Sequence, residues 1–282
     1  DHRALQWLPV FFRPLCLTLL LFFLFVEPLR AAPQKTQQQG DTVKTIRQLL
    51  DSSKYNATRN TRASIHQAEK ALHMSHTGDL PLQEARSLYH LGYAHYNLNH
   101  YDSANHYLKK ARKLSRKNSQ EQTLALTLNR IGNTYQLQGE FDKALENYQQ
   151  ALKIHRKNNN RKEVARSLTN IGSIYRTFGK YDEAIQFHLE ALSIYENTDY
   201  PEGTAWTSLN ISRLFKLNED YDKALEYLEQ ALSIYRNIAR QEGIETGVTL
   251  CLKEYSLIYS QSGKPQKALE YSEKVLQRNK QA

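Results

Sequence analysis

Histidine is the residue type in this chain with the most obvious capacity to bind a metal ion or transfer protons. The chain has ten histidines in 282 residues, and they are unevenly spread. Four gather between residues 90 and 106, and one further pair lies three residues apart. These are His90, His95, His100 and His106, and His73 with His76. A zinc site needs ligands at set spacings, such as H-E-x-x-H, and no such motif or supporting carboxylate set is present. We therefore expect structural or solvated histidines and no metal.

Nucleophilic and phosphate-binding chemistry is also poorly supported by the sequence. The chain contains no G-x-S-x-G motif, no phosphate-binding glycine loop and no dinucleotide fingerprint. Cys16 and Cys251 are its only cysteines, so there is no C-x-x-C pair for a thiolate metal site. These residues predict no catalytic group and no cofactor.

A repeat explains the glycines and many of the tyrosines. The stretch from Ile171 to Tyr195 holds small and aromatic residues that recur forty residues upstream, and part of the set recurs forty residues downstream. The recurring set is Gly172, Tyr175, Gly179, Tyr181, Ala184 and Ala191; then Gly132, Tyr135, Gly139, Phe141, Ala144 and Ala151; then Tyr221, Ala224 and Ala231. Self-similarity at this period is typical of a solenoid.

The repeat predicts the domain organisation. We expect a solenoid over 41–282, with a degenerate first unit at 41–78, full units at 84–119, 124–159, 164–199 and 204–239, and a last unit at 244–282. Each unit is predicted to be two antiparallel helices joined by a turn, and glycine there supplies a left-handed conformation. Aspartates at the start of each second helix are expected to cap it, namely Asp102, Asp142, Asp182 and Asp222. Four residues are added between the last two units, and we expect them in the loop or at the start of the first helix, near Gln241–Gly247.

These positions resemble the tetratricopeptide repeat, whose pattern is W-x2-L-G-x2-Y followed by A-x3-F. Leu168, Gly172, Tyr175 and Ala184 fill those slots, and His188 stands in place of the phenylalanine. The resemblance implies an all-α, right-handed superhelical solenoid in which the first helix of each unit lines a groove for a peptide. His95 then falls in the slot of Tyr135 and Tyr175, a packing position.

The resemblance also implies where specificity lies. Groove positions are two before, one after and four after the small residue of each first helix. They are His90, Tyr93, Tyr96, Arg130, Asn133, Gln136, Asn170, Ser173, Arg176, Asn210, Arg213 and Lys216. Asparagine can hold an extended peptide backbone, and Arg and Lys favour carboxylates. An ordinary solvated polar face is the alternative for the same residues.

The N-terminus has the features of an export signal. Leu15 to Val26 is an apolar run preceded by Arg13 and followed by Ala31 and Ala32, so residues 1–31 are expected to be a signal peptide or a retained anchor. Residues 32–40 are expected to form a polar linker. The order of an export signal, then D-T-V-K-T-I-R-Q-L-L at Asp41–Leu50, then 40-residue repeats resembles the N-terminal sensor regions of bacterial histidine kinases and helix-turn-helix regulators. The resemblance implies an exported, periplasmic or membrane-associated location. A kinase domain would lie beyond the residues present.

The formal net charge of +9 bears on the partner. We expect a non-catalytic scaffold that binds a protein or peptide, with an acidic partner favoured by the charge. A structural or assembly scaffold that uses its outer faces is the alternative, and nucleic-acid binding is the weaker one. Membrane contact is expected only through the N-terminal segment or parts of the protein beyond these residues.

Overall fold

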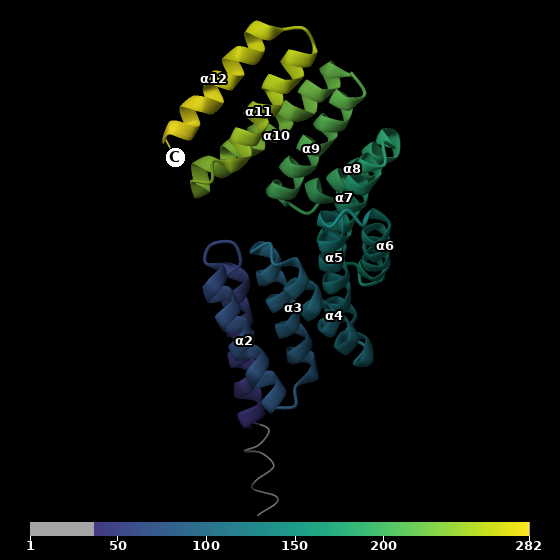
Figure 1. Cartoon of the computed structure of the whole chain (residues 1–282), viewed down its shortest axis with the longest axis vertical. Helices are drawn as coiled ribbons and strands as arrows, with labels where there is room; N and C mark the ends of the chain where they lie inside the picture. Colours follow the sequence, from purple (N-terminus) through teal and green to yellow (C-terminus); the bar gives the residue numbers. More distant parts are fainter. Residues whose placement is uncertain (1–36, 282) are drawn as a thin grey trace, which may run out of the picture. The chain divides into compact units, whose positions relative to one another are not determined.

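The computed structural model describes residues 37–281, and all the regular structure within that range is helical. A first helix covers residues 37–56. The others are α2 (Thr61–Thr77), α3 (Pro81–Asn97), α4 (Tyr101–Lys117), α5 (Glu121–Leu137), α6 (Phe141–Lys157), α7 (Arg161–Thr177), α8 (Tyr181–Glu196), α9 (Pro201–Leu217), α10 (Tyr221–Glu242), α11 (Thr246–Gln261) and α12 (Pro265–Gln281) (Figure 1). The predicted all-α repeat solenoid is confirmed. The predicted signal peptide or anchor at 1–31 lies outside the described residues.

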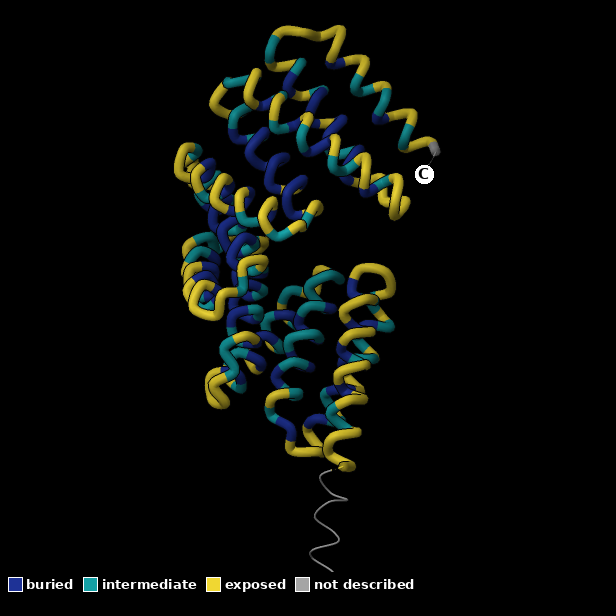
Figure 2. Tube along the Cα trace, turned by 180° about the vertical axis from the view of Figure 1, so that it is seen from behind, coloured by how far each residue is buried: buried dark blue, intermediate teal, exposed yellow. Residues whose placement is uncertain are grey.

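The described part of the chain forms two compact units, residues 37–99 and residues 100–281. In the first unit, α2 packs against α3, and a small core contains Ile46, Leu50, Ala71 and Leu80. In the second unit, each of the helices α4 to α12 packs against the next one along the chain. The buried residues lie on the sides of the helices that face their neighbours, and the exposed residues lie on the other sides (Figure 2).

A left-handed residue follows each of the helices α2 to α11, and its position recurs every twenty residues through most of the chain. Positive φ angles occur at Asp79, Asn99, Ser119, Gly139, Asn159, Gly179, Asp199 and Glu219, and then at Gly243 and Gly263. The next N–H donates to a carbonyl five residues back, as from Glu140 to Tyr135 at 2.9 Å. This is the Schellman arrangement, which satisfies helix-end carbonyl groups. The turns predicted near Asn99, Gly139, Gly179 and Glu219 are therefore only every second one of these left-handed turns. The others, at Asp79, Ser119, Asn159 and Asp199, connect one helix pair to the next.

Small residues allow the two helices of a unit to approach closely. A Cβ atom added at Gly132 would lie 2.5 Å from the Tyr148 ring, and one at Gly172 would lie 2.9 Å from the His188 ring. Where serine fills this slot, its hydroxyl bonds across the pair: Ser212 donates to the Ala224 carbonyl oxygen at 2.7 Å. The facing alanines are fully buried, and so are those that meet the next unit. Packing therefore requires glycine at positions 132 and 172, whereas the slot on α9 admits serine.

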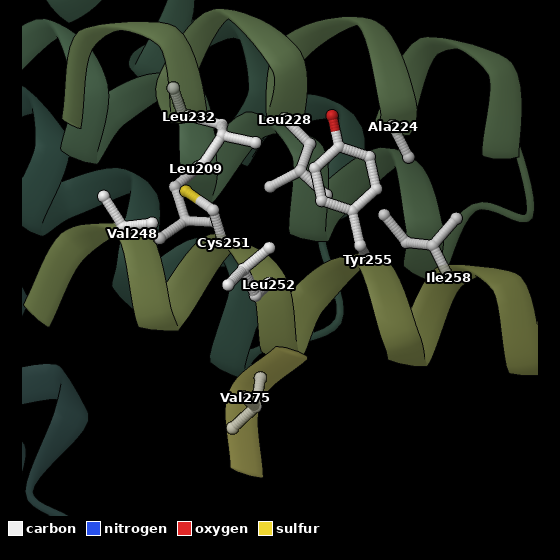
Figure 3. Packing of buried hydrophobic residues seen from close by; sticks show 11 residues of the cluster. Leu209, Ala224, Leu228, Leu232, Val248, Cys251, Leu252, Tyr255, Ile258 and Val275 are labelled. Atoms are coloured by element: carbon white, nitrogen blue, oxygen red, sulfur yellow. The ribbon is translucent and has the colours of Figure 1, made fainter. Parts of the chain in front are cut away.

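The last two repeat units, which comprise α9 to α12, share a continuous apolar core. Leu209 of α9, Leu228 of α10 and Cys251 and Tyr255 of α11 point toward one another, and Val275 joins from α12 (Figure 3). Rings also stack here, with Tyr255 and Tyr271 centroids 4.6 Å apart. This core fixes α11 against α9, which positions the charged residues described below.

Three expectations about boundaries and caps differ from the structure. Residues 37–40, expected as linker, are helical; the glutamines before Gly40 are good helix formers, and their preference opposes the unfavourable glycine. The first helices of the full units begin about three residues before the predicted starts. The aspartates expected as caps lie in the first helical turn instead, and Asp220 is the N-cap of α10, accepting from the Lys223 N–H at 3.2 Å. Near a helix N-terminus a carboxylate still complements the helix dipole.

The four added residues between the last two units also lie elsewhere than expected. They do not form a longer loop but extend α10, which has 22 residues where α6 has 17. Ile238 is buried and Ala239 packs on the core of the last two units, so the extension is held by apolar contacts. Gly243 then ends the helix with φ of 71°.

Candidate binding face

The first helices of the second unit lie next to one another on one side of the stack. Contacts join α5 with α7, α7 with α9 and α9 with α11, although a second helix lies between each pair in the sequence. We call the polar side chains that these four helices present on this side the first-helix face. Nine of the predicted groove residues belong to it, from Arg130 to Lys216.

On α5, the face is tied to a buried tyrosine of α6. The Tyr148 hydroxyl lies 2.8 Å from both the Gln136 Oε1 atom and the Asn133 amide. A phenol has one proton, so it donates to Gln136 and accepts from the Asn133 nitrogen. With its amide in that orientation, Asn133 also donates to the Asn129 carbonyl oxygen at 3.1 Å and accepts from Arg130 Nη1 at 3.2 Å. Arg130, Asn133 and Gln136 are therefore held in one network.

On α7, the three predicted residues behave differently from one another. The side-chain amides of Asn170 and Asn133 lie 3.3 Å apart, but Asn170 Nδ2 donates to Asn133 only when Asn133 presents its oxygen, which is not the orientation that bonds Tyr148 and Arg130. Ser173 donates to the Thr169 carbonyl oxygen of its own helix at 3.0 Å, which is a local bond. Arg176 is half-buried and, within residues 37–281, makes no side-chain hydrogen bond or ion pair. It is the first candidate for contact with a ligand.

On α9, the face carries a buried ion-pair cluster that includes a residue from α11. Glu254 is 4% exposed, and its carboxylate accepts from Arg213 Nε at 2.9 Å and from the Lys216 ammonium. Asn210 is 6% exposed; its oxygen lies 3.5 Å from Arg213 Nη1, and its Nδ2 atom has no hydrogen-bond partner in the described chain. We define Arg176, Asn210, Arg213, Lys216 and Glu254 as the basic cluster.

The sequence prediction omitted Glu254, although a signal for it was available. Glu254 stands two residues before Ser256, the small residue of α11, so it occupies the same slot as Asn210, Asn170 and Arg130. The predicted groove positions cover the four full units only, so the last unit contributes none of them. The insertion before α11 hides this match, because the spacing from Asn210 to Glu254 is 44 and not 40.

Burial and neighbouring charge shift the pKa of two side chains at this face. Burial lowers the pKa of Arg176, the Arg213 charge lowers it further, and the Glu254 carboxylate raises it. On α8, burial lowers the pKa of His188 to about 4, and the charge of Arg176 makes a smaller contribution in the same direction. His188 Nδ1 is buried without a hydrogen-bond partner in the described residues, so the ring is neutral near pH 7.

His90, Tyr93 and Tyr96 belong to the first unit. All three lie half-buried on α3, and the His90 ring meets Tyr89 edge-on with centroids 5.3 Å apart. They are therefore not among the nine predicted groove residues of the second unit that belong to the first-helix face.

Other kinds of site find little support among residues 37–281. No group of three or more His, Cys, Asp or Glu side chains there is arranged to hold a metal ion. Burial raises the pKa of the Cys251 thiol to about 12, so it is protonated near neutral pH. Nor does this part of the chain include a helix long and apolar enough to cross a membrane.

The repeat pattern can be compared directly with known families. Profiles described as tetratricopeptide repeat match residues 123–197 and 179–237, and also residues 85–118 and 254–281, which together exceed half of the chain. This chain belongs to the tetratricopeptide repeat family. No curated protein matches the sequence.

Several solved structures share the tetratricopeptide repeat fold of this chain. BtubC (BKLC) from P. vanneervenii has a TM-score of 0.65 at 20% identity and covers 77% of this chain and 90% of its own. NprR in complex with its cognate peptide NprX has a TM-score of 0.63 at 17% identity, covering 95% and 79%. A Rap protein complexed with competence and sporulation factor has a TM-score of 0.62 at 15% identity, covering 83% and 74%. At these identities the likeness shows the fold alone.

Proposed function

We propose that this tetratricopeptide repeat protein is a non-catalytic scaffold that binds a protein or peptide through its first-helix face. The carrying observation is that amide and basic side chains of three successive first helices, α5, α7 and α9, lie on one side of the stack, while one of these side chains stays unbonded. Arg176, which is half-buried, is that side chain in the described chain. Unbonded donors at a partly buried surface favour a ligand that supplies acceptors. An extended peptide has a carbonyl group at every residue.

The structural likenesses support this function at the level of the fold. Two of the similar structures, NprR and the Rap protein, are complexes with a peptide or a named factor. The peptide and the factor are ligands of those two proteins only. The support for our proposal is that a stack of helix pairs offers a long surface on which an extended peptide segment can bind.

The test is partner capture with a matched pair of variants. Crosslinked pull-down with the double variant Arg130→Ala and Asn170→Ala is expected to recover about tenfold less partner, since loss of one to two central contacts costs roughly 1–3 kcal/mol. We avoid Arg213 here, because it bonds Glu254 and its loss would disturb folding.

The control variant is Lys153→Ala with Arg156→Ala, which removes two exposed cations from α6. It should recover as much partner as the unaltered protein. Unchanged recovery with the face variant, or an equal loss with the α6 variant, would contradict the proposal. The second result would favour a scaffold that uses its outer faces, and recovery abolished by nuclease would favour nucleic-acid binding.

We also propose that the protein is exported and that binding is the sensing step of a bacterial signal-transduction protein. The motive is the apolar N-terminal run and the sequence resemblance to sensor regions of histidine kinases and related regulators. Fusing residues 1–40 to alkaline phosphatase, which is active only after export, is expected to give activity in a bacterial host. A control fusion that lacks residues 15–26 should be inactive, and equal activity of the two fusions would contradict export.

A further inference from the structure

The second helix α4 carries a concentration of cations on its outer side. Four exposed lysines share that side, and Asp102 is the one acidic residue of the helix. We define Lys109, Lys110, Lys113 and Lys117 as the lysine face, because at 3.6 residues per turn they lie within about 100° around the helix axis. None of them forms an ion pair or a hydrogen bond within the described chain.

This arrangement is unfavourable for the helix alone. Lysines elsewhere in the second unit pair with an acid three or four residues away, as Lys223 does with Asp220 and Lys274 with Glu270. On the lysine face, the residues at these spacings are further lysines. Like charges four residues apart destabilise a helix. The lysine face therefore does not serve the stability of α4, which indicates a role in binding.

The helix dipole does not explain the lysine face. Cations stabilise the last turn of a helix, and on α4 that turn holds Arg116 and Lys117. The other three lysines of the face lie before that turn, where the dipole has little effect. The corresponding second helix α8 has four acidic residues and no lysine or arginine. The repeat fold therefore does not require cations at these slots.

The outer side of α6 extends this positive surface. Arg116 of α4 donates to the Gln150 Oε1 atom of α6 at 3.3 Å, so the outer sides of the two helices adjoin. Lys153 occupies the slot of Lys113 on α6, and it is exposed and without an ion pair in the described chain. Neither α4 nor α6 exposes a large apolar side chain. This surface can therefore attract a partner through charge, without apolar contact.

We propose that the lysine face, together with Lys153, binds the anionic headgroups of a phospholipid membrane. A lysine ammonium is a point charge that does not fix the geometry of its partner, so it suits a mobile layer of headgroups. Single-stranded nucleic acid is usually bound with aromatic side chains that stack on its bases, and the surface exposes none. The acidic residues of α8 favour an orientation with α4 next to the membrane and α8 away from it.

This inference rests on the proposed export, which brings the chain to a membrane, and it adds a contact to that of the N-terminal segment. The experiment measures cosedimentation of the full chain with two kinds of vesicle at low ionic strength. One kind is phosphatidylcholine alone, and the other is an equimolar mixture with phosphatidylglycerol. The ratio of the two partition coefficients reports the electrostatic part, because apolar insertion of the N-terminal run contributes to both.

Two triple variants with the same loss of charge are compared. The test variant changes the lysine face: Lys109→Gln, Lys110→Gln and Lys113→Gln. The control variant changes exposed lysines of α11, α12 and the turn between them: Lys253→Gln, Lys264→Gln and Lys280→Gln.

The unaltered protein is expected to prefer the phosphatidylglycerol vesicles and to lose this preference at high ionic strength. The test variant should reduce the ratio about a hundredfold, because each cation near an anionic surface raises the affinity about fivefold. The control variant should reduce it by less than about fivefold, since charges away from the surface are screened. The test variant should also unfold at no lower temperature than the unaltered protein, because like charges have been removed.

Equal reductions by the two variants, or no preference of the unaltered protein, would overturn the inference. Tighter binding of duplex DNA or polyglutamate than of the phosphatidylglycerol vesicles, at equal concentrations of negative charge, would overturn it in favour of another partner. A lower unfolding temperature of the test variant would assign the lysines to folding and would overturn it too. The alkaline phosphatase fusion contains residues 1–40 and no part of α4, so export and membrane binding by α4 fail separately.

Discussion

Replacing Glu254 by glutamine is expected to lower the free energy of unfolding of the second unit by about 3 kcal/mol, since loss of one partner of a buried ion pair costs roughly 3–5 kcal/mol. The carboxylate is 4% exposed and is the one hydrogen-bonded anion for Arg213 and Lys216 among the described residues. Glutamine keeps the size and one acceptor oxygen but leaves both cations without a counter-charge. The lower end of the range applies, because the side chains of Arg213 and Lys216 retain 22% and 12% exposure.

Denaturant unfolding followed by the fluorescence of Trp206 measures this effect close to its origin. Trp206 lies on α9, and its ring is 5.9 Å from the Arg213 guanidinium carbon. A local reporter is needed because a repeat array can unfold in parts, so one global transition cannot be assumed.

The matched control is Glu190→Gln. Glu190 also forms an ion pair between successive units, with Arg156 at 2.7 Å, but the two side chains are 48% and 53% exposed. Exposed pairs contribute at most about 1 kcal/mol. Similar losses for the Glu254 and Glu190 variants would show that burial does not make the Glu254 pairs strong, and would contradict the interpretation of the basic cluster.

Acidification is expected to destabilise the second unit through His188. The pKa of this histidine is about 4 in the folded chain against 6.5 for the ordinary group, because burial disfavours the charged ring. Between these values the unfolded chain binds more protons than the folded chain. The contribution of His188 to stability is therefore fully present above pH 6.5 and is lost as the pH falls to 4. A shift of this size corresponds to about 3 kcal/mol.

The variant His188→Leu isolates this contribution. Leucine fills the same slot as Leu108 and Leu228 in other units, both of which are fully buried, so it is a suitable apolar replacement. The difference in unfolding free energy between variant and unaltered protein should move in favour of leucine by about 3 kcal/mol from pH 7 to pH 4. His155, whose pKa burial also lowers, is present in both proteins and cancels. A difference that stays constant with pH would show that the His188 ring is hydrated or paired in solution.

Much of the fold could be predicted because it depends on residues close in sequence. Gly139 and Gly179 lie at turns for which a left-handed conformation is needed, and Gly132 and Gly172 lie where a Cβ atom would strike a ring. Each of these requirements recurs every forty residues, so the four imperfect repeats all indicate the same pair of helices. The position of the four residues added before α11 could not be predicted, because a longer α10 and a longer loop increase the distance in sequence between the last two repeat units by the same amount.

The candidate site was predictable only as a set of positions. Asn133, Ser173 and Arg213 occupy one slot on successive helices, yet one joins a network with Tyr148, one bonds its own helix and one pairs with Glu254. These partners lie up to 41 residues apart in the chain. No local pattern selects among them, because each choice depends on which side chains the neighbouring helices bring within hydrogen-bonding distance.

The sequence alone thus determined the helix pairs, their order and the side of each first helix that carries polar groups, since helical period and small-residue packing act within one unit. The tertiary structure decided which of those polar groups are already bonded. It placed Glu254 between Arg213 and Lys216, left Arg176 beside them without a bonded anion, and buried His188 behind that face. Electrostatic pairing acts through space between units, so it becomes visible only when the units are stacked.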